Sequence, residues 1–230
     1  MSELAPVAFM LVFAAIIGLI VWLVVRTVRH NRAPRDPAVR EDLARLATAK
    51  GWRFSPRDDG FLRRFAGGYP FGHGARQRPA LDLVTGTHRG RNFACFQYSP
   101  PRSLPSGEYS SEIDYARVVV VSLPEPVPTV VVTAARFAPR WTRRYTVGDD
   151  AFDRAFTVGT EDEPFADRVL TEPVRHWLLE HPPTGSLRLG GPDLIGWQPD
   201  TGGFEASMVE PEVDRLCDLL DRIPTDALRR

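Results

Sequence analysis

The strongest secondary-structure signal in the chain comes from residues 81–98, which read LDLVTGTHRGRNFACFQY. Two runs of strand-like composition, 81–87 and 92–98, are separated by the turn-forming sequence His88-Arg89-Gly90-Arg91. This pattern is typical of a β-hairpin, in which a short turn containing glycine joins two antiparallel strands. The segment therefore predicts the hairpin from which an antiparallel sheet can grow.

Further strands are predicted on the C-terminal side of this hairpin. Tyr115–Leu123 contains four consecutive valines and is typical of a strand buried on both faces. We expect the proline-rich segment 124–128 to turn the chain, so that Thr129–Thr133 returns as a partner strand. The remaining predictions are a strand, alone or with a turn, at 151–160, and three short strands near Leu187, at 194–197 and at 204–208.

Apolar residues recur at helical spacing in several other segments. Asp36 as N-cap and Gly51 as terminator predict a helix between them, and Asp58 or Asp59 is expected to cap a short helix containing Phe61 and Leu62. Further helices are expected at 165–170, 171–180 and 211–223. The fold class is therefore predicted to be α+β, with an N-terminal transmembrane helix followed by an antiparallel-sheet domain on which helices pack.

The N-terminal segment carries the pattern of a membrane anchor. Val7–Val25 is a run of 19 residues without a charge, and a helix of about 20 residues crosses the hydrocarbon core of a bilayer. A cleaved secretory signal would instead have a basic start, a shorter apolar run and a small-residue cleavage site. Glu3 precedes the run and arginines follow it, which favours an uncleaved single-pass anchor over a signal peptide.

The charges beside this run predict its orientation, because the arginine-rich flank of a span stays in the cytoplasm. We expect an anchor with a basic collar at 1–35 and a cytosolic α+β domain at 36–230, with the N-terminus outside the cell membrane. The second part holds 25 basic and 28 acidic residues, so no nucleic-acid partner is expected. In the reducing cytoplasm, Cys95 and Cys217 are expected to remain free thiols.

Several enzyme classes are excluded by residue types that are missing. Lys50 is the only lysine among 29 basic residues, and its context matches neither a phosphate-binding P-loop nor a Schiff-base site. The motifs G-x-S-x-G and H-E-x-x-H are absent, and neither cysteine has a histidine beside it in the sequence. We therefore predict no catalytic residue and no cofactor.

Histidines leave an enzymatic alternative open. His73, in the glycine-rich loop 67–79, or His88, at the hairpin turn, would suit a hydrolase if a carboxylate lay nearby. His176 and His181 are five residues apart and diverge on a helix, so no metal site is predicted. The acidic residues at 149, 150, 153 and 161–163 lack the spacing of a calcium loop and are expected to form a solvated face.

One basic and aromatic segment is the best candidate for an interaction surface. Residues 136–145 read RFAPRWTRRY, a composition that suits nucleic acid, anionic lipid or a phosphorylated partner. The simpler alternative is a surface loop whose aromatic rings pack inward while the arginines stay in water. The candidate binding residues are Arg136, Arg140, Trp141, Arg143 and Arg144.

Three stretches carry a resemblance to a known group of proteins: residues 85–98, the valine strand leading into LPEPVP at 123–128, and AFDRAFTV at 151–158. With the N-terminal span, its basic stop and the helix ending in Gly51-Trp52, they resemble membrane-anchored proteins of unknown function from high-GC actinobacteria. The resemblance implies a single transmembrane helix and a cytosolic α+β domain. It rests on packing and turn residues, so it implies no catalytic residue.

Together these features predict a single-pass membrane protein. Its cytosolic domain is expected to bind or scaffold a protein, ligand or anionic-lipid partner at the inner membrane face, without catalysis. The alternatives are a membrane-anchored hydrolase that uses His73 or His88, and a structural module that oligomerises through the span or a sheet edge.

Overall fold

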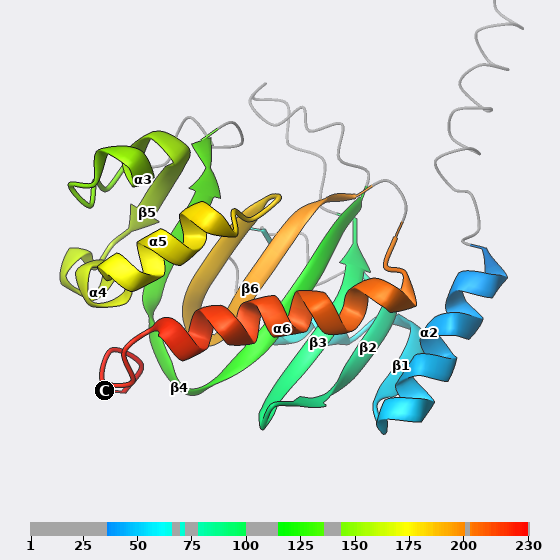
Figure 1. Cartoon of the computed structure of the whole chain (residues 1–230). Coiled ribbons are helices and arrows are strands. Elements are labelled where there is room, and N and C mark those ends of the chain that lie inside the picture. Colours follow the sequence, from blue (N-terminus) through cyan, green and yellow to red (C-terminus); the bar gives the residue numbers. More distant parts are fainter. Residues whose placement is uncertain are drawn as a thin grey trace, which may run out of the picture. The chain divides into compact units, whose positions relative to one another are not determined.

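The computed structural model describes residues 36–65, 70–71, 78–99, 115–135, 144–200 and 203–229. From Ala38 onward, the described residues belong to one compact unit. Its helical elements are α2 (Pro37–Lys50), η1 (Phe61–Arg64), α3 (Asp150–Ala155), α4 (Glu163–Val169), α5 (Glu172–Glu180) and α6 (Ala206–Arg222). Its strands are β1 (Arg53–Asp58), β2 (Ala80–His88), β3 (Arg91–Tyr98), β4 (Tyr115–Ala134), β5 (Phe156–Thr160) and β6 (Ser186–Asp200) (Figure 1).

A six-stranded antiparallel sheet forms the centre of this unit. Strands β1, β2 and β3 are successive neighbours, and β3 pairs with the first part of β4. The second part of the same β4 edge pairs with β5, whereas the other edge pairs with β6, from Tyr115–Asp200 to Thr133–Ser186. The predicted antiparallel sheet with helices packed on it is therefore confirmed.

The predicted hairpin is present as β2 and β3, which pair from Leu81–Gln97 to His88–Arg91. Its two turn residues, Arg89 and Gly90, have φ values of 49° and 77°. Positive φ at both central residues is the requirement of the turn that best matches the twist of a two-residue hairpin. The turn thus places His88, Arg89 and Arg91 at the tip of a defined hairpin.

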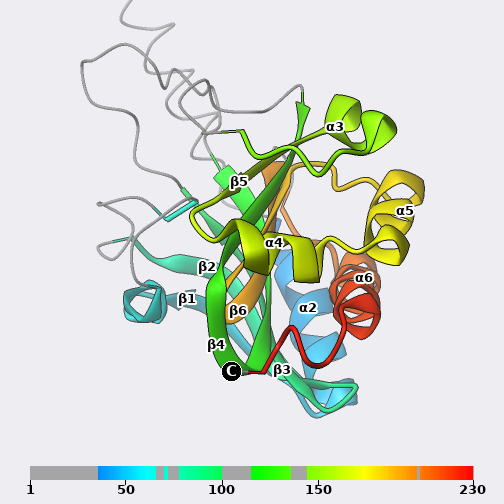
Figure 2. The ribbon, with the colours of Figure 1, turned by 90° about the vertical axis from the view of Figure 1, so that its left-hand side faces the viewer.

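The two faces of the sheet are covered differently. The longer helices α2, α5 and α6 lie on one side of the sheet (Figure 2), and Phe93 and Cys95 of β3 join their apolar core. Phe96 and Tyr98 point to the opposite face, where they pack in a second cluster that includes Leu62 of η1. Side chains of β3 therefore alternate between the two faces of the sheet.

The predicted turn at 124–128 is wrong, because β4 continues through it as one strand of 20 residues. Pairing of β4 with β3 ends at Val121, and pairing with β5 begins only at Val130. The register against β6 also shifts on both sides of Val127. The three prolines thus occupy an irregular stretch where their missing N–H groups break no regular ladder, so the strand bends and does not end.

Residues 151–160 were expected to form a strand, alone or with a turn; 156–160 do form strand β5, whereas 151–155 belong to helix α3. Asp149 begins the helix, because its carboxylate accepts the backbone N–H groups of Ala151 and Phe152 at 3.1 Å. These bonds hold the pKa of Asp149 below its ordinary value, and the bond from Phe152 has the largest effect. Asp162 caps α4 in the same way through the N–H of Phe165, so the acidic residues include helix caps as well as solvated groups.

The prediction of three short strands, near Leu187, at 194–197 and at 204–208, is also wrong. Residues 186–200 form the single strand β6, in which Gly191 adopts a φ of 59° opposite the bend of β4. The segment 204–208 leads into α6, which begins at Ala206 and contains Pro211 in its interior. Gly191 thus lies inside a strand that was expected to be interrupted, and Pro211 lies inside a helix that it was expected to begin.

The predicted span at 7–25 lies outside the described residues. Within the part of the chain that the structure describes, no helix is long and apolar enough to cross a membrane.

Candidate functional site

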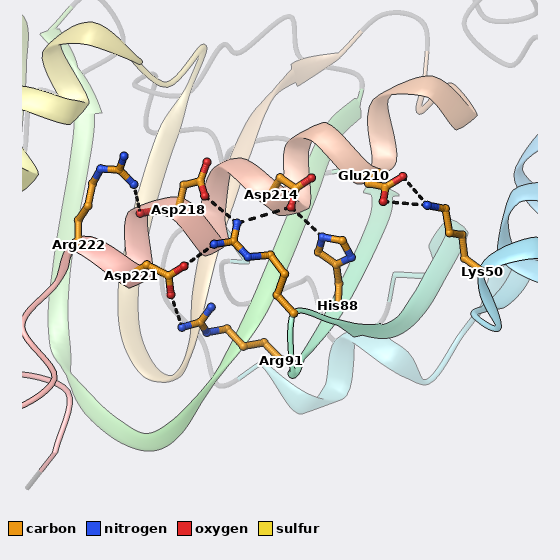
Figure 3. A network of polar contacts seen from close by, with 9 residues as sticks. Lys50, His88, Arg91, Glu210, Asp214, Asp218, Asp221 and Arg222 are labelled. Atoms are coloured by element: carbon orange, nitrogen blue, oxygen red, sulfur yellow. Dashed lines mark hydrogen bonds and ion pairs between the residues drawn. The ribbon is translucent and has the colours of Figure 1, made fainter.

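The densest polar cluster of the described residues lies along one side of α6. Glu210, Asp214, Asp218 and Asp221 are spaced four, four and three residues apart, which places them on one face of a helix. Val213, Leu216 and Leu220 point the other way, into the core beneath the sheet. The carboxylates consequently form a stripe that faces the tip of the β2–β3 hairpin (Figure 3).

The hairpin tip meets this acidic stripe with three side chains. His88 Nε2 lies 2.7 Å from Asp214 Oδ1, and Arg91 Nη2 lies 2.6 Å from Asp221 Oδ1. Arg89 extends between them and donates to Asp218 at 2.6 Å and to Asp221, while its Nη1 stays 3.6 Å from Asp214. The hydrogen bond to Asp218 and the charge of Asp221 raise the pKa of Arg89, so this cation is permanent.

Helix α2 contributes a fourth side chain that meets the acidic stripe. The Nζ atom of Lys50 lies 2.8 Å from both carboxylate oxygens of Glu210. The chain's only lysine thus ties the end of α2 to the start of α6. At the other end, Arg222 donates to the carbonyl of Asp218 and stacks over Trp177 of α5.

Trp52 positions His88 from the opposite side of the ring. The two rings meet edge to face with centroids 6.1 Å apart, and Trp52 makes a closer contact of the same kind, 4.8 Å, with Phe93. Gly86 leaves room for the indole, because a Cβ atom at this position would lie 2.3 Å from Trp52 Cδ1. The imidazole is therefore held between an aromatic ring and a carboxylate.

Within the described ranges, no hydroxyl, thiol or amine is hydrogen-bonded to the imidazole of His88. The side-chain partners of His88 among the described residues are Asp214 and the ring of Trp52. Covalent catalysis requires a hydroxyl, thiol or amine within hydrogen-bonding reach of the base. His88, Glu210 and Asp214 each offer a ligand atom within 4.8 Å of the others, so the same residues present a potential cation site.

Both cysteines lie in the core and are free thiols, as expected. Burial raises the pKa of Cys95 well above its ordinary value and also raises that of Cys217, although Arg91 acts in the opposite direction on the latter. A buried, protonated thiol is a poor nucleophile. These groups therefore act in packing.

We predict that neither thiol reacts with an aromatic disulfide reagent at pH 8 until the domain opens, so labelling is at least about a hundredfold slower than in urea. Because folding favours the protonated thiols, their contribution to stability is present below about pH 8.5 and is lost as the pH rises further. Labelling rates of Cys95→Ala and Cys217→Ala assign the two sites. Rapid labelling of either thiol in the native protein would contradict its burial.

Only some of the residues that the sequence analysis proposed for a site are described by the structure. Arg136, Arg140, Trp141 and Arg143 lie outside the described residues, as does His73, whereas Arg144 is exposed next to Tyr145. Tyr145 donates a hydrogen bond to Asp167, which raises the pKa of Tyr145 to about 12. His176 pairs with Glu180, and His181 contacts Trp177, so the structure does not bring these histidines to His88.

Of the two histidines proposed for a hydrolase, His88 does have the required carboxylate, which is Asp214. Sequence reasoning missed this partner because 126 residues separate the two positions. The signal that was available is the spacing of acidic residues in the last helix, which predicts a carboxylate stripe but not what faces it.

In the part of the chain that the structure describes, cavities beside α6 include an open crevice and a small enclosed space, and neither is lined by His88 or Asp214. An open crevice of about 500 Å³ lies between Val39, Asp42 and Arg45 of α2 and residues 205–207 at the start of α6. A much smaller cavity of about 10 Å³, room for about one water molecule, is lined by Gly185, Trp197 and the side chains of Arg117, Glu212 and Arg215 among others. The network on α6 is thus a contact between elements and does not line either cavity.

Comparison with known proteins finds similarity at the level of the fold. No described protein family matches the sequence, and no curated protein matches it either. Among solved structures, the fold is similar to the crystal structure of the mycobacterial trehalose monomycolate transport factor A, with a TM-score of 0.56 at 15% sequence identity. The match covers 82% of this chain and 98% of that one. At this level of identity the similarity establishes a shared fold.

Proposed function

We propose that this chain is a single-pass membrane protein whose cytosolic α+β domain binds or scaffolds a partner at the inner membrane face, without catalysis. The observation that carries the proposal is that the carboxylates along α6 pair with side chains of the same chain. Glu210, Asp214, Asp218 and Asp221 are engaged by cations or by His88 of the same chain, and the network joins α2, the hairpin and α6. Such a network supports a rigid binding domain.

The fold similarity supports the same reading. The similar structure is named as a transport factor, and we propose that this chain too is an accessory factor in a membrane process. Residues 7–25 would anchor it, as in the actinobacterial proteins of unknown function that the sequence resembles.

The crevice between α2 and α6 is a candidate place for a partner. The acidic side chains of Asp42 and Glu205 favour a partner with basic groups at that position.

The hydrogen bond between His88 and Asp214 is the one observation that favours the alternative hydrolase. In that case His88→Ala would abolish turnover while leaving partner capture intact. In the scaffold proposal, His88 positions the hairpin and has no turnover to support.

The proposal predicts two separable contributions to membrane association. The full chain should resist alkaline extraction from membranes, and deletion of residues 7–25 should release it. The released domain should still sediment with vesicles rich in phosphatidylglycerol, and charge reversal at Arg140, Arg143 and Arg144 should weaken that binding about a hundredfold. The estimate uses roughly 1 kcal/mol for each arginine near an anionic surface.

Two matched variants make this result interpretable. Charge reversal at Arg53, an exposed arginine on β1, should leave vesicle binding unchanged, as should Asp214→Asn. Equal binding by the triple variant and the original domain would eliminate residues 136–145 as the interaction surface. Release of the full chain by alkaline extraction would eliminate the anchor.

A further inference from the structure

The group formed by His88, Glu210 and Asp214 has the composition and geometry of a divalent-metal ligand set. One ligand atom from each residue lies within 4.8 Å of the other two, and all three residues are half-buried. His88 ends β2, whereas Glu210 and Asp214 lie one turn apart on α6 (Figure 3). Two separate elements therefore bring three donors within 4.8 Å of one another.

The donor types select the class of ion. An imidazole nitrogen with two carboxylates suits borderline divalent ions such as Zn²⁺, whereas Ca²⁺ and Mg²⁺ prefer oxygen donors alone. Ligand atoms lie about 2.0–2.2 Å from Zn²⁺, so two ligands of a tetrahedral site are roughly 3.3–3.6 Å apart. The His88–Asp214 pair, now at 2.7 Å, therefore has to open slightly, and Glu210 has to turn toward the other two donors. Side-chain rotation of the glutamate and aspartate supplies this movement, while Trp52 and the hairpin turn hold the histidine.

Charge balance favours a cation at this end of the stripe. Four carboxylates, at 210, 214, 218 and 221, face three permanent side-chain cations, Lys50, Arg89 and Arg91. Arg89 lies closest to Asp218 and Asp221, which leaves Asp214 paired mainly with a histidine that is neutral when it acts as a ligand. The excess negative charge therefore falls beside the imidazole.

Lys50 forms an ion pair with Glu210, one of the three ligands, so a bound metal ion must displace Lys50 from this carboxylate. Its side chain is 42% exposed and ends in a compact, strongly hydrated ammonium group on a flexible stem. It can move into water without disturbing the core, so it competes with the metal but does not block the position. We propose that His88, Glu210 and Asp214 bind one divalent transition-metal ion, with Zn²⁺ as the best match, and that Lys50 holds Glu210 when the metal is absent.

The untagged full chain in detergent, stripped of metal and titrated with Co²⁺ and then Zn²⁺, tests this site. We expect one equivalent to bind at pH 7.5, with visible Co²⁺ absorption that Zn²⁺ removes and a rise in the unfolding temperature. His88→Ala and Glu210→Gln should each weaken binding at least tenfold. Lys50→Met should tighten it, because the competing cation is gone.

The direction of the Lys50 effect separates a metal site from a purely ionic contact. His176→Ala is the matched control, because His176 also pairs with a glutamate, Glu180, on an exposed helix face and should not change the titration. Glu210→Gln keeps the proposal testable even if the His88 variant unfolds. The proposal fails if no saturable binding occurs below millimolar metal, or if His88→Ala and Glu210→Gln bind as the original chain does.

Discussion

Replacing Gly185 with alanine is expected to destabilise the domain by about 3 kcal/mol, at the upper end of the range for inserting a methyl group into a packed site. A Cβ atom at this position would lie 2.1 Å from the carbonyl oxygen of Trp197 and 2.8 Å from the Cα of Gln198. Both obstacles are backbone, and Trp197 is fixed by its pairing with Val118 in β4. The methyl group can be accommodated only if strand β6 shifts.

The reason for this close approach is the bend of β4 and β6. Gly185 precedes β6 and accepts the N–H of Ala134, near the end of β4, yet it also touches the last part of β6. The two parts of the strand pair thus approach each other beside the small cavity lined by Arg117 and Arg215. A side chain at position 185 would force them apart.

Urea unfolding followed by circular dichroism measures the effect. For a domain of about 200 residues, a loss of 3 kcal/mol lowers the unfolding temperature by about 6–12 °C. Gly60→Ala is the matched control, since its Cβ would meet only Asp58 Oδ1 at an ordinary 3.5 Å, and it should cost less than about 1 kcal/mol. Equal stability of the two variants would mean that the two ends of β6 do not touch.

The hairpin shows how far local sequence determines this fold. The turn residues at 88–91 and the strand-like runs on either side were sufficient to predict β2 and β3, because both signals depend on near neighbours. The helix ending at Gly51 was predictable for the same reason, since its terminator has a φ of 69° and lies directly after the last helical residue.

The errors lie where distant partners decide the outcome. The prolines at 124–128 were expected to end a strand, but the pairing of β4 with β3, β5 and β6 turns them into a bend. The pairing of His88 with Asp214 was missed for the same reason, because Asp214 becomes a partner of His88 only when α6 packs across the hairpin. Composition indicated that Lys50 was unusual, but only packing shows that its partner is Glu210.

Replacing Asp82 with alanine is expected to cost about 3 kcal/mol and to loosen helix α2 from the sheet. The Asp82 side chain is only 2% exposed, and its Oδ1 accepts a hydrogen bond from Arg40 Nε at 2.9 Å. Hydrogen bonds to charged groups contribute about 1.5–3 kcal/mol, more than neutral ones. Because Arg40 lies on α2, the bond joins that helix to an irregular position of β2, where the register shifts between Leu81 and Val84.

Backbone conformation adds to this cost. Asp82 has a φ of 48°, a left-handed conformation that aspartate tolerates better than alanine does. Asp82→Gly should therefore lose the ion pair but recover about 1 kcal/mol relative to Asp82→Ala. If the two variants were equally stable, backbone conformation would have no part in the effect.

Asp42→Ala is the matched control for the ion pair itself. Asp42 pairs with Arg45 on the exposed face of the same helix, and an exposed pair of this kind contributes at most about 0.5 kcal/mol. Hydrogen exchange should show faster opening of the α2 amides in Asp82→Ala but not in Asp42→Ala. The Arg40–Asp82 ion pair attaches α2 to the sheet, and the contact of Lys50 with Glu210 attaches it to α6, so loss of the first alone should loosen the helix without freeing it.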